Sequence, residues 1–376
     1  MNWKERLKKF EPMRKFIRQA LHSARPGICE DVAVWGRKNG LKVLEIHKPT
    51  YDKILPLVLE DATARSEFDF HEADYRRPQS LVVVPKARVR DAVGFVFLSD
   101  GSVCYQGNWV RSYLTQNLSY QARFRKKRFL KGNVFSLLGL WSGEFYHWFH
   151  DTLPRLLTAL PHLPSDIKFL VNEKSHAYQL DSLSALGIGP ERLELQPNQV
   201  DTVTESLWFA TPLGHSTIGA GDVIKQLALK LQNGFNVQRN QKISDRIYIS
   251  RQKARCRRVC NELAILPRLC GAGFKIVVCE DLSLADQVKL FINASCVLGP
   301  HGAGLTNMIF CAEGTRIGEI ICGKEPRPCF LVMSRQLGFH FYRFTARSKK
   351  IPEDGEGMEL DPNCFASEFK EFVHQT

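Results

Sequence analysis

Residues 297–307 read VLGPHGAGLTN and join an apolar run to a glycine-rich turn and then to a second apolar segment. The apolar run is typical of a buried strand, and the glycines let the backbone approach a ligand closely. The first N–H groups of a following helix would point at an anion. We therefore expect a strand, a phosphate-binding loop and a helix, with His301 at the mouth of the loop. Taken alone, the pattern also fits a tight strand–helix turn with an incidental histidine.

The loop belongs to a regular alternation of strand-like and helical segments. Strand-like runs alternate with helical runs at 246–250, 261–271, 275–278, 283–293, 296–299, 304–311 and 316–320. A similar alternation covers 134–140, 143–160, 167–171, 178–187 and 206–210. Residues 40–140 are mostly strand-like, and the turn at 99–102 suggests a hairpin. This order predicts an α/β fold with parallel strands and with ligands at the carboxyl ends of those strands.

Charged residues cluster where the predicted strands end. Arg251 follows the first strand after the polar stretch 233–244, and Arg255, Arg257 and Arg258 come next, before Asn261. Arginines at this edge of a sheet favour a diphosphate clamp over a set of solvated side chains. Glu319 closes the strand after the glycine loop, and Glu280 follows another strand. Either carboxylate could accept ribose hydroxyls, and we favour Glu319.

The amino-terminal half carries its own motif on the predicted helix 143–160. His147, His150, Asp151 and Arg155 are spaced to share one face of that helix, and Pro154 interrupts its hydrogen-bond ladder. Three interpretations are open: a metal site that lacks a fourth ligand, an internal polar network, and an acid–base centre. We prefer the last, with Asp151 as the base and a histidine orienting it.

The composition is that of a soluble globular protein with an excess of positive charge. Of 376 residues, 44% are hydrophobic and 24% are charged, and 52 Lys and Arg against 39 Asp and Glu give a net charge of +13. That excess suits a phosphate-bearing partner. The 11 cysteines are odd in number and several lie in apolar runs, which is typical of a reducing compartment.

We expect three segments: a basic amphipathic segment at 1–39, an acceptor-side α/β domain at 40–235, and a Rossmann-like domain at 236–376. No apolar run long enough to span a membrane and no secretory signal occur in the sequence. We therefore expect a cytoplasmic protein. Residues 1–25 fit either a solvated capping helix or peripheral contact with an anionic membrane on the inner face of the plasma membrane.

Three stretches together resemble the family-61 glycosyltransferases, which include plant core xylosyltransferases and animal N-acetylglucosaminyltransferases of the secretory pathway. They are FYHWFHDTLPRL at 145–156, RIYISRQKARCRRVCNE at 246–262 and VLGPHGAGLTNMIFCAEGTRIGEI at 297–320. Their order and spacing make the resemblance specific over residues 140–322, whereas residues 1–130 match nothing that we can name. Acceptor specificity is expected to reside there.

The resemblance implies a GT-B architecture, in which two Rossmann-like domains face each other across a cleft. It also implies an inverting, metal-independent transfer from a nucleotide-sugar, usually a UDP-sugar, without a cofactor. Arg251, Arg257, Arg258 and His301 would meet the diphosphate, Glu319 the ribose, and Arg155 the donor or its own helix. The remaining candidate contacts are Asn261, Glu280, Gly302, Ala303, Gly304, Leu305, Thr306 and Asn307.

The partners expected from the resemblance are a nucleotide-sugar donor and a glycan or lipid-linked glycan acceptor. Without an anchor or a signal, the chain looks like a bacterial cytoplasmic member that builds surface polysaccharide.

Parts of the sequence are also compatible with two other classes of protein. An α/β-hydrolase would need a Gly-x-Ser-x-Gly elbow downstream of the glycine loop, and the nearest string, at 214–218, lies upstream and lacks the second glycine. A non-catalytic protein that binds nucleic acid or another polyanion is the remaining alternative, because residues 123–129 mix basic and aromatic side chains. One short segment is weak support, so we expect no nucleic-acid partner.

Overall fold

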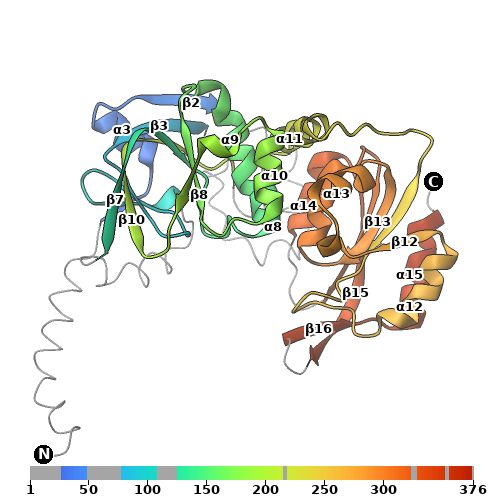
Figure 1. Cartoon of the computed structure of the whole chain (residues 1–376). Coiled ribbons are helices and arrows are strands. Elements are labelled where there is room, and N and C mark those ends of the chain that lie inside the picture. The colour runs from blue at the N-terminus through green and yellow to red at the C-terminus, as the bar shows by residue number, and fades with distance from the viewer. Residues whose placement is uncertain are drawn as a thin grey trace, which may run out of the picture.

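The computed structural model describes residues 27–48, 78–107, 125–214, 218–322, 328–351 and 355–374. The proposed membrane-contacting segment 1–25 and the start of the basic segment 123–129 lie outside these ranges. Within them the chain is mixed α/β, built on two sheets that Figure 1 shows side by side, with helices between them. No helix among the described residues is long and apolar enough to cross a membrane.

The first sheet has ten strands. Its central strand β10 (Val200–Ala210) pairs parallel with β7 (Lys126–Ser136) and antiparallel with β3 (Gln79–Pro85) and β4 (Arg88–Arg90). The parallel part continues from β7 to β8 (Lys168–Asn172). The remaining strands are β1 (Ile28–Cys29), β2 (Val43–His47), β5 (Phe95–Phe97), β6 (Val103–Cys104) and β9 (Leu193–Gln196). The helices of this part are α3 (Val32–Lys38), α8 (Phe145–His147), α9 (Leu153–Ala159), α10 (Ala177–Ala185) and α11 (Gly221–Gly234).

The second sheet has six strands in the order β12-β11-β13-β14-β15-β16. Its strands are β11 (Asp245–Ile249), β12 (Phe274–Val277), β13 (Ala294–Pro300), β14 (Arg316–Cys322), β15 (His340–Ile351) and β16 (Gly355–Glu359). All neighbours pair parallel except β15 with β16. After β11 the chain adds β12 on one side of it, and then adds β13, β14 and β15 in turn on the other side. The gap between β11 and β13 is therefore the switch point, where doubly wound sheets bind ligands.

Helices cover both faces of the second sheet because alternate residues of its strands point to opposite sides. One face packs under α13 (Leu284–Phe291), α14 (Cys329–Leu337) and the 3-10 helix η7 (Ala303–Phe310), and the other under α12 (Glu262–Gly271) and α15 (Pro362–His374). On β13, for example, Val297 belongs to the first of these cores and Leu298 to the second.

One apolar cluster extends from the first sheet to the second. It contains Phe135 of β7, Leu153 of α9 and Ile224 of α11, together with Met308 of η7 and Val297 of β13. Helix α11 contacts α9 and α10 on one side and α13, α14 and η7 on the other. The helices between the sheets therefore pack directly on one another. The division of the chain after residue 235 stays a prediction.

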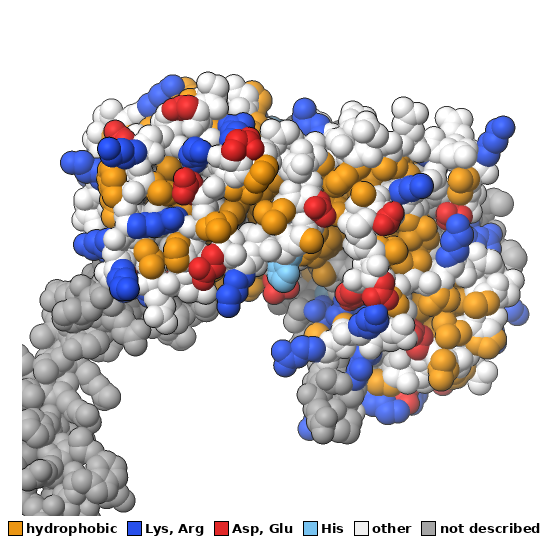
Figure 2. Space-filling view, in the orientation of Figure 1, with side chains coloured by type: hydrophobic (Ala, Val, Ile, Leu, Met, Phe, Trp, Pro, Cys, Tyr) orange, Lys and Arg blue, Asp and Glu red, His pale blue; other side chains and the backbone are white. Residues whose placement is uncertain are grey.

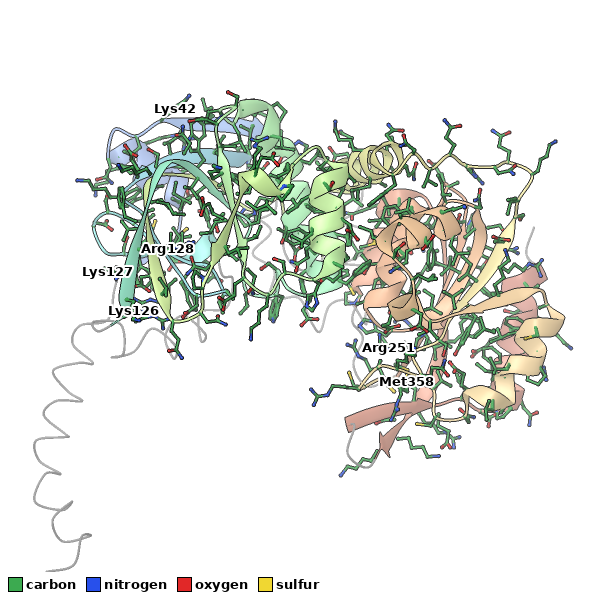
Figure 3. All side chains as sticks on the ribbon, in the orientation of Figure 1. Lys42, Lys126, Lys127, Arg128, Arg251 and Met358 are labelled. Carbon is green, nitrogen blue, oxygen red and sulfur yellow. The ribbon has the colours of Figure 1, made fainter. Side chains whose placement is uncertain are left out.

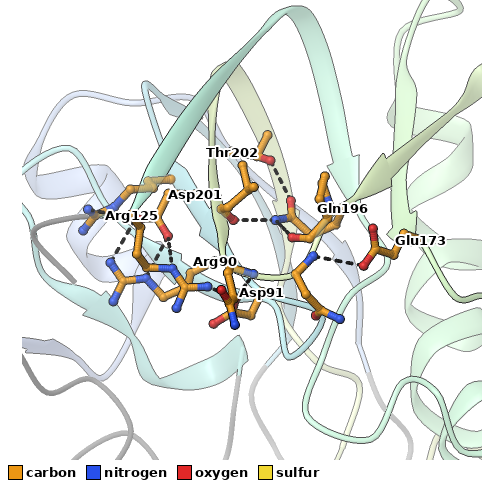
Figure 4. Close-up of polar contacts among 12 residues, drawn as sticks. Arg90, Asp91, Arg125, Glu173, Gln196, Asp201 and Thr202 are labelled. Atoms are coloured by element: carbon orange, nitrogen blue, oxygen red, sulfur yellow. Dashed lines mark hydrogen bonds and ion pairs between the residues drawn. The ribbon is translucent and has the colours of Figure 1, made fainter. Parts of the chain in front are cut away.

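A buried carboxylate anchors the arginine-rich side of the first sheet. Asp201 is fully buried and accepts two hydrogen bonds of 2.9 Å from Arg90, while Arg88 and Arg125 lie 3.2 and 3.4 Å from its oxygens (Figure 4). An uncompensated charge in this position would be costly, so the cluster depends on Asp201.

Two local expectations were refined by the structure. The turn at 99–102 does close a hairpin, between β5 and β6, with Gly101 at φ +83° and a hydrogen bond from Leu98 N to Ser102 O. Its second strand has two residues, too few for an alternating pattern to be visible in the sequence. The predicted helix 143–160 begins at Phe145 and contains a π-helical turn at Trp148–Thr152. That turn precedes Pro154, whose missing N–H and ring disfavour regular α-helix there.

Candidate functional site

The glycine loop and Arg251 lie at the switch point of the second sheet. Arg251 follows β11 and the loop follows β13, so both leave the same edge of two neighbouring strands. Figure 3 shows Arg251 on the side of the second sheet and its helices that faces the part of the chain built on the first sheet. In the space-filling view, the parts of the chain built on the two sheets meet at the top and leave a hollow between them below (Figure 2). Lys and Arg side chains border this hollow on the side of the second sheet.

The guanidinium group of Arg251 lies directly over Gly302. A Cβ atom at position 302 would lie 2.6 Å from Arg251 Cζ and closer still to Nη1, so only glycine leaves room for this arrangement. Gly302 has φ 163°, an extended conformation open to any residue, so the close approach and not the backbone requires glycine here. Gly299 and Gly304 are similarly tight, since a Cβ on either would lie 3.0 Å from the Ile249 side chain.

Among the described residues, the positive charge of Arg251 is only partly compensated by Glu280. Its Nη2 donates to Cys256 O at 3.1 Å, whereas its buried Nε has no hydrogen-bond partner among the described residues. Burial lowers the pKa of Arg251, and the neighbouring charge of Arg257 lowers it further. Arg257 itself adopts a positive φ of 57°, which is uncommon for a residue with a side chain. Two guanidinium groups held together in this way would be stabilised by a bound anion.

His301 is paired with Glu319 beneath the loop. The distance between His301 Nδ1 and Glu319 Oε1 is 2.5 Å, Glu319 is fully buried, and its Oε2 has no hydrogen-bond partner in the part of the chain that the structure describes. A carboxylate with no exposed surface is poorly placed for the ribose contact that we predicted. The geometry instead gives Glu319 the role of orienting the His301 ring, with Nε2 as the nitrogen left for a ligand.

The rest of the loop is held from within. Leu305 is a core residue, and Asn307 Nδ2 donates to Gln287 Oε1 at 2.8 Å and to Gly304 O at 3.1 Å. Ala303 begins η7, the short helix that we expected at 304–311. Thr306 Oγ1 and Asn307 Oδ1 are buried and find no partner within the described ranges. These bonds fix the shape of the loop, so Leu305 and Asn307 contribute structure rather than a direct ligand contact.

Three other residues that we predicted to contact the ligand are Asn261, Arg258 and Glu280. Asn261 is engaged elsewhere, because its side chain donates to Leu360 O and accepts from Leu360 N. Arg258 also belongs to this anchored segment, since its carbonyl accepts from Met358 N. Glu280 is exposed in the short helix Cys279–Asp281 and is close enough to Arg251 to act on its charge.

The histidine–aspartate motif forms a hydrogen-bonded triad. Asp151 Oδ2 lies 2.7 Å from His147 Nδ1, and Asp151 Oδ1 lies 2.7 Å from His150 Nδ1. The His150 side chain is fully buried, whereas those of His147 and Asp151 are 21% and 35% exposed. His150 is stacked on Tyr146, and its Nε2 would be 2.7 Å from a Cβ at Gly219. Of the two histidines, His147 is therefore the one that a substrate can reach.

Asp151 is held in its ionised form. Burial alone would raise the pKa of Asp151, but the charge of His150 and the hydrogen bonds from both histidines outweigh burial and lower it. Both carboxylate oxygens are occupied and proton affinity is low, so Asp151 is a poor base. This arrangement favours Asp151 as the group that orients a histidine over our prediction that it is the base.

A small pocket of about 70 Å³ opens beside the triad. Its lining residues are Gln106, Leu138, Gly139, Leu140, Trp141, Ser142, His147, Asp151, Thr152, Arg155 and Pro212. Burial lowers the pKa of Arg155 to about 10, against the opposing effect of Asp151, and Arg155 Nη2 donates to Ser136 O at 2.9 Å. The side chain thus keeps its charge near neutral pH and ties the start of α9 to the end of β7.

A row of rings joins the two motifs. The Phe330 ring lies 5.3 Å from His301 and 5.6 Å from Tyr146, which stacks on His150 at 4.7 Å. The glycine loop and the histidine–aspartate triad are therefore parts of one region. No group of His, Cys, Asp or Glu side chains within the described ranges is arranged to hold a metal ion.

Sequence reasoning missed Trp141, Tyr146, Gly219 and Phe330. Tyr146 lies within the quoted motif, and its aromatic ring gave the one signal that could have been followed. Gly219 and Phe330 are far from both motifs in sequence, and only the fold brings them to the site.

Comparison with known proteins gives matches to this region. Residues 145–318 match the model of the family Glycosyltransferase 61. The EGF domain-specific O-linked N-acetylglucosamine transferase of Bos taurus is 32% identical over 76 residues, which are 20% of this chain and 14% of that protein. A beta-1,2-xylosyltransferase of Arabidopsis thaliana is 33% identical over 73 residues, 19% of this chain and 14% of that protein.

A longer match links the chain to a beta-1,2-xylosyltransferase of Oryza sativa subsp. japonica, which is 27% identical over 175 residues. That stretch covers 43% of this chain and 31% of the rice protein. The aligned stretches thus span well under half of these relatives' own lengths.

Proposed function

The chain carries a family-61 glycosyltransferase domain over residues 145–318, and on that premise we propose that it transfers a sugar from a nucleotide-sugar, most simply a UDP-sugar, to a hydroxyl group of a glycan or lipid-linked glycan. We include in the proposal a GT-B-like architecture, with the donor held by the second sheet and the acceptor by the first. A cytoplasmic location and a part in surface polysaccharide synthesis stay predictions of the sequence.

The observation that supports the donor site best is the state of Arg251. Its guanidinium lies over the backbone of Gly302, has a buried Nε that no described residue pairs with, and is held beside the charge of Arg257. A diphosphate would supply the missing acceptor and offset both positive charges, and arginine suits such groups because its donors form a fork. His301, fixed by Glu319, and the N–H groups at the start of η7 would complete the cradle.

The proposed chemistry is an inverting displacement. His147, oriented through Nδ1 by Asp151, takes the proton of the acceptor hydroxyl at Nε2. The hydroxyl oxygen forms the new bond to the anomeric carbon on the face opposite the nucleotide. The bond from that carbon to the diphosphate oxygen breaks, and its electron pair leaves with the nucleoside diphosphate. Arg251 and Arg257 stabilise the charge that develops there, a role that a metal ion has in other enzymes. Transfer that persists in EDTA would support this part of the proposal.

The donor site is tested by thermal shift against a panel of nucleoside diphosphates and nucleotide-sugars. We expect stabilisation by UDP and UDP-sugars, lost in Arg251→Ala and retained in Arg255→Ala, an exposed arginine of the same loop. Stabilisation by another nucleotide and not by UDP would correct the donor. No stabilisation by any nucleotide would contradict the proposal as a whole.

The alternative, a non-catalytic polyanion-binding protein, rests on one surface of the first sheet. Lys126 and Lys127 are exposed at the start of β7, and Phe129 beside them is 55% exposed (Figure 3). Salt-dependent binding of single-stranded DNA without binding of any nucleotide-sugar would favour that function. The charge trapped at Arg251 is unexplained by it, so we prefer the glycosyltransferase.

A further inference from the structure

Trp141 is an exposed tryptophan at the edge of the histidine–aspartate site. It lies in the turn between β7 and α8 and is 44% exposed, whereas Trp148 and Trp208 are buried. Its indole stacks on the His147 ring, with centroids 5.0 Å apart and planes 28° from parallel. One face of the indole is thus covered by the proposed base. The exposed part of the indole remains available to a ligand.

The pocket beside Trp141 combines an apolar surface with polar groups of several kinds. Trp141 and Pro212 contribute apolar surface, the Arg155 guanidinium and the Gln106 carboxamide contribute hydrogen-bonding groups, and His147 lies at the same pocket. Gln106 is fixed in place because its Oε1 accepts from Val32 N at 2.8 Å. A few fixed polar groups around an apolar surface are typical of a small-molecule site.

A pyranose ring has the matching chemistry. One face of the ring presents C–H groups that pack on an aromatic plane, and its edge presents hydroxyls that accept from Arg155 and exchange hydrogen bonds with an amide. Trp141 and His147 both line this pocket, so a pyranose bound in it would lie beside His147. A peptide hydroxyl on a serine or threonine lacks the extended apolar face that Trp141 offers.

We propose that this pocket is the acceptor subsite and that Trp141 is the platform on which a pyranose of the acceptor stacks. The proposal rests on the proposed function and makes the acceptor class specific: the attacking hydroxyl belongs to a sugar ring, and Arg155 and Gln106 bind its neighbouring hydroxyls. It places acceptor recognition partly at residues 138–155, beyond the segment 1–130 to which the sequence had assigned it.

The direct test is 19F NMR on the full chain labelled with 5-fluorotryptophan. Trp141→Phe identifies the resonance of Trp141, and methyl pyranosides of glucose, galactose, mannose and xylose are then added up to about 50 mM, a range in which contacts of millimolar affinity are detectable. We expect at least one pyranoside to shift the Trp141 resonance and to leave those of Trp148 and Trp208 in place. If none shifts it, or if glycerol shifts it equally, the proposal is wrong.

Kinetics separate this proposal from the function on which it rests. With any acceptor that the wild type uses, Trp141→Ala should lower kcat/KM for the acceptor by about 10- to 200-fold, the usual worth of a lost apolar contact, and Trp141→Tyr should restore most of it. UDP affinity should stay within twofold in both variants. Phe129→Ala, an exposed aromatic on β7, is the matched control and should match the wild type.

Two failures are then distinct. If the wild type binds no nucleotide, the proposed function fails and the acceptor subsite with it. If the wild type binds UDP and transfers sugar while Trp141→Ala does so with an unchanged acceptor KM, the function stands and the Trp141 platform is refuted.

Discussion

Replacing Gly302 by alanine should disable the donor site without unfolding the protein. The new Cβ would lie 2.6 Å from Arg251 Cζ, whereas carbon atoms in contact are about 3.5–4.0 Å apart. The guanidinium must therefore move by about 1 Å. Because residue 302 has φ 163°, alanine adds no backbone strain, and the free energy of unfolding should change by less than about 1 kcal/mol.

Displacing the Arg251 guanidinium should lower both the affinity for UDP and the rate of transfer. A hydrogen bond to a charged group contributes about 1.5–3 kcal/mol, so UDP affinity should fall by about 10- to 100-fold. A misplacement of about 1 Å at a reacting centre costs about 100-fold in rate, and kcat/KM for the donor should fall at least that far.

Calorimetric titration with UDP and steady-state kinetics measure the two effects, and urea unfolding checks the stability. Gly271→Ala is the matched control, because a Cβ at that glycine meets nothing within 4 Å. Wild-type UDP affinity in Gly302→Ala would refute the placement of the diphosphate at Arg251. Equal losses in Gly302→Ala and Gly271→Ala would show a general effect of substitution in this half of the chain.

Three further predictions concern the base, the first sheet and the buried thiols. His147→Ala should lower kcat by about 100- to 10,000-fold while leaving UDP affinity unchanged, and Asp151→Asn should have a smaller effect; the reverse order would return the role of base to Asp151. Asp201→Ala should lower the free energy of unfolding by about 3–5 kcal/mol in urea, since it removes the carboxylate that pairs with the buried Arg90, and a loss below about 1 kcal/mol would contradict this account. Burial raises the pKa of Cys279 and Cys296 to about 12, from 9.0, so their stabilisation is complete below pH 9 and is lost as the pH rises towards 12. Cys296→Ala should therefore lose less stability than the wild type between pH 8 and 10, and an equal loss would refute this.

The α/β fold could be predicted because its signal is local. Buried parallel strands such as β13 are short apolar runs, and the helices between them begin with capping residues, as Ser283 does at α13, where its Oγ accepts from Asp286 N. The strand order of the second sheet and the pairing of β10 with both β3 and β7 could not be predicted in this way. They depend on contacts between residues far apart in the chain.

The sequence predicted which residues belong to the candidate site better than it predicted the role of each residue. The residue types and spacing of the two motifs identified Arg251, His301 and the histidine–aspartate group, and the structure brings these together. The sequence could not show how far the carboxylates of Glu319 and Asp151 are exposed. Both are acidic residues within a motif, Glu319 after a glycine and Asp151 after a histidine, and neither pattern predicts burial. Their burial and hydrogen bonds place Glu319 beside His301 and Asp151 between His147 and His150.

Some predicted contacts failed to reach the site for reasons that the sequence conceals. Asn261 is close to the arginines in sequence, yet it bonds to the backbone of Leu360, which arrives from the carboxyl-terminal end of the chain. Trp141 was overlooked for the opposite reason. An aromatic residue before a helix is usually part of the core, and only its exposed fraction marks it as a surface that a ligand could cover.

The central claim is that a nucleoside diphosphate binds at the switch point of the second sheet, and a crystal structure of the chain with UDP tests it most directly. We predict phosphate oxygens within hydrogen-bond distance of Arg251 and of the backbone N–H groups of residues 302–304, with Nε of Arg251 satisfied by the ligand. UDP bound elsewhere, for example against the lysines of β7, with Arg251 still unpartnered, would contradict the account.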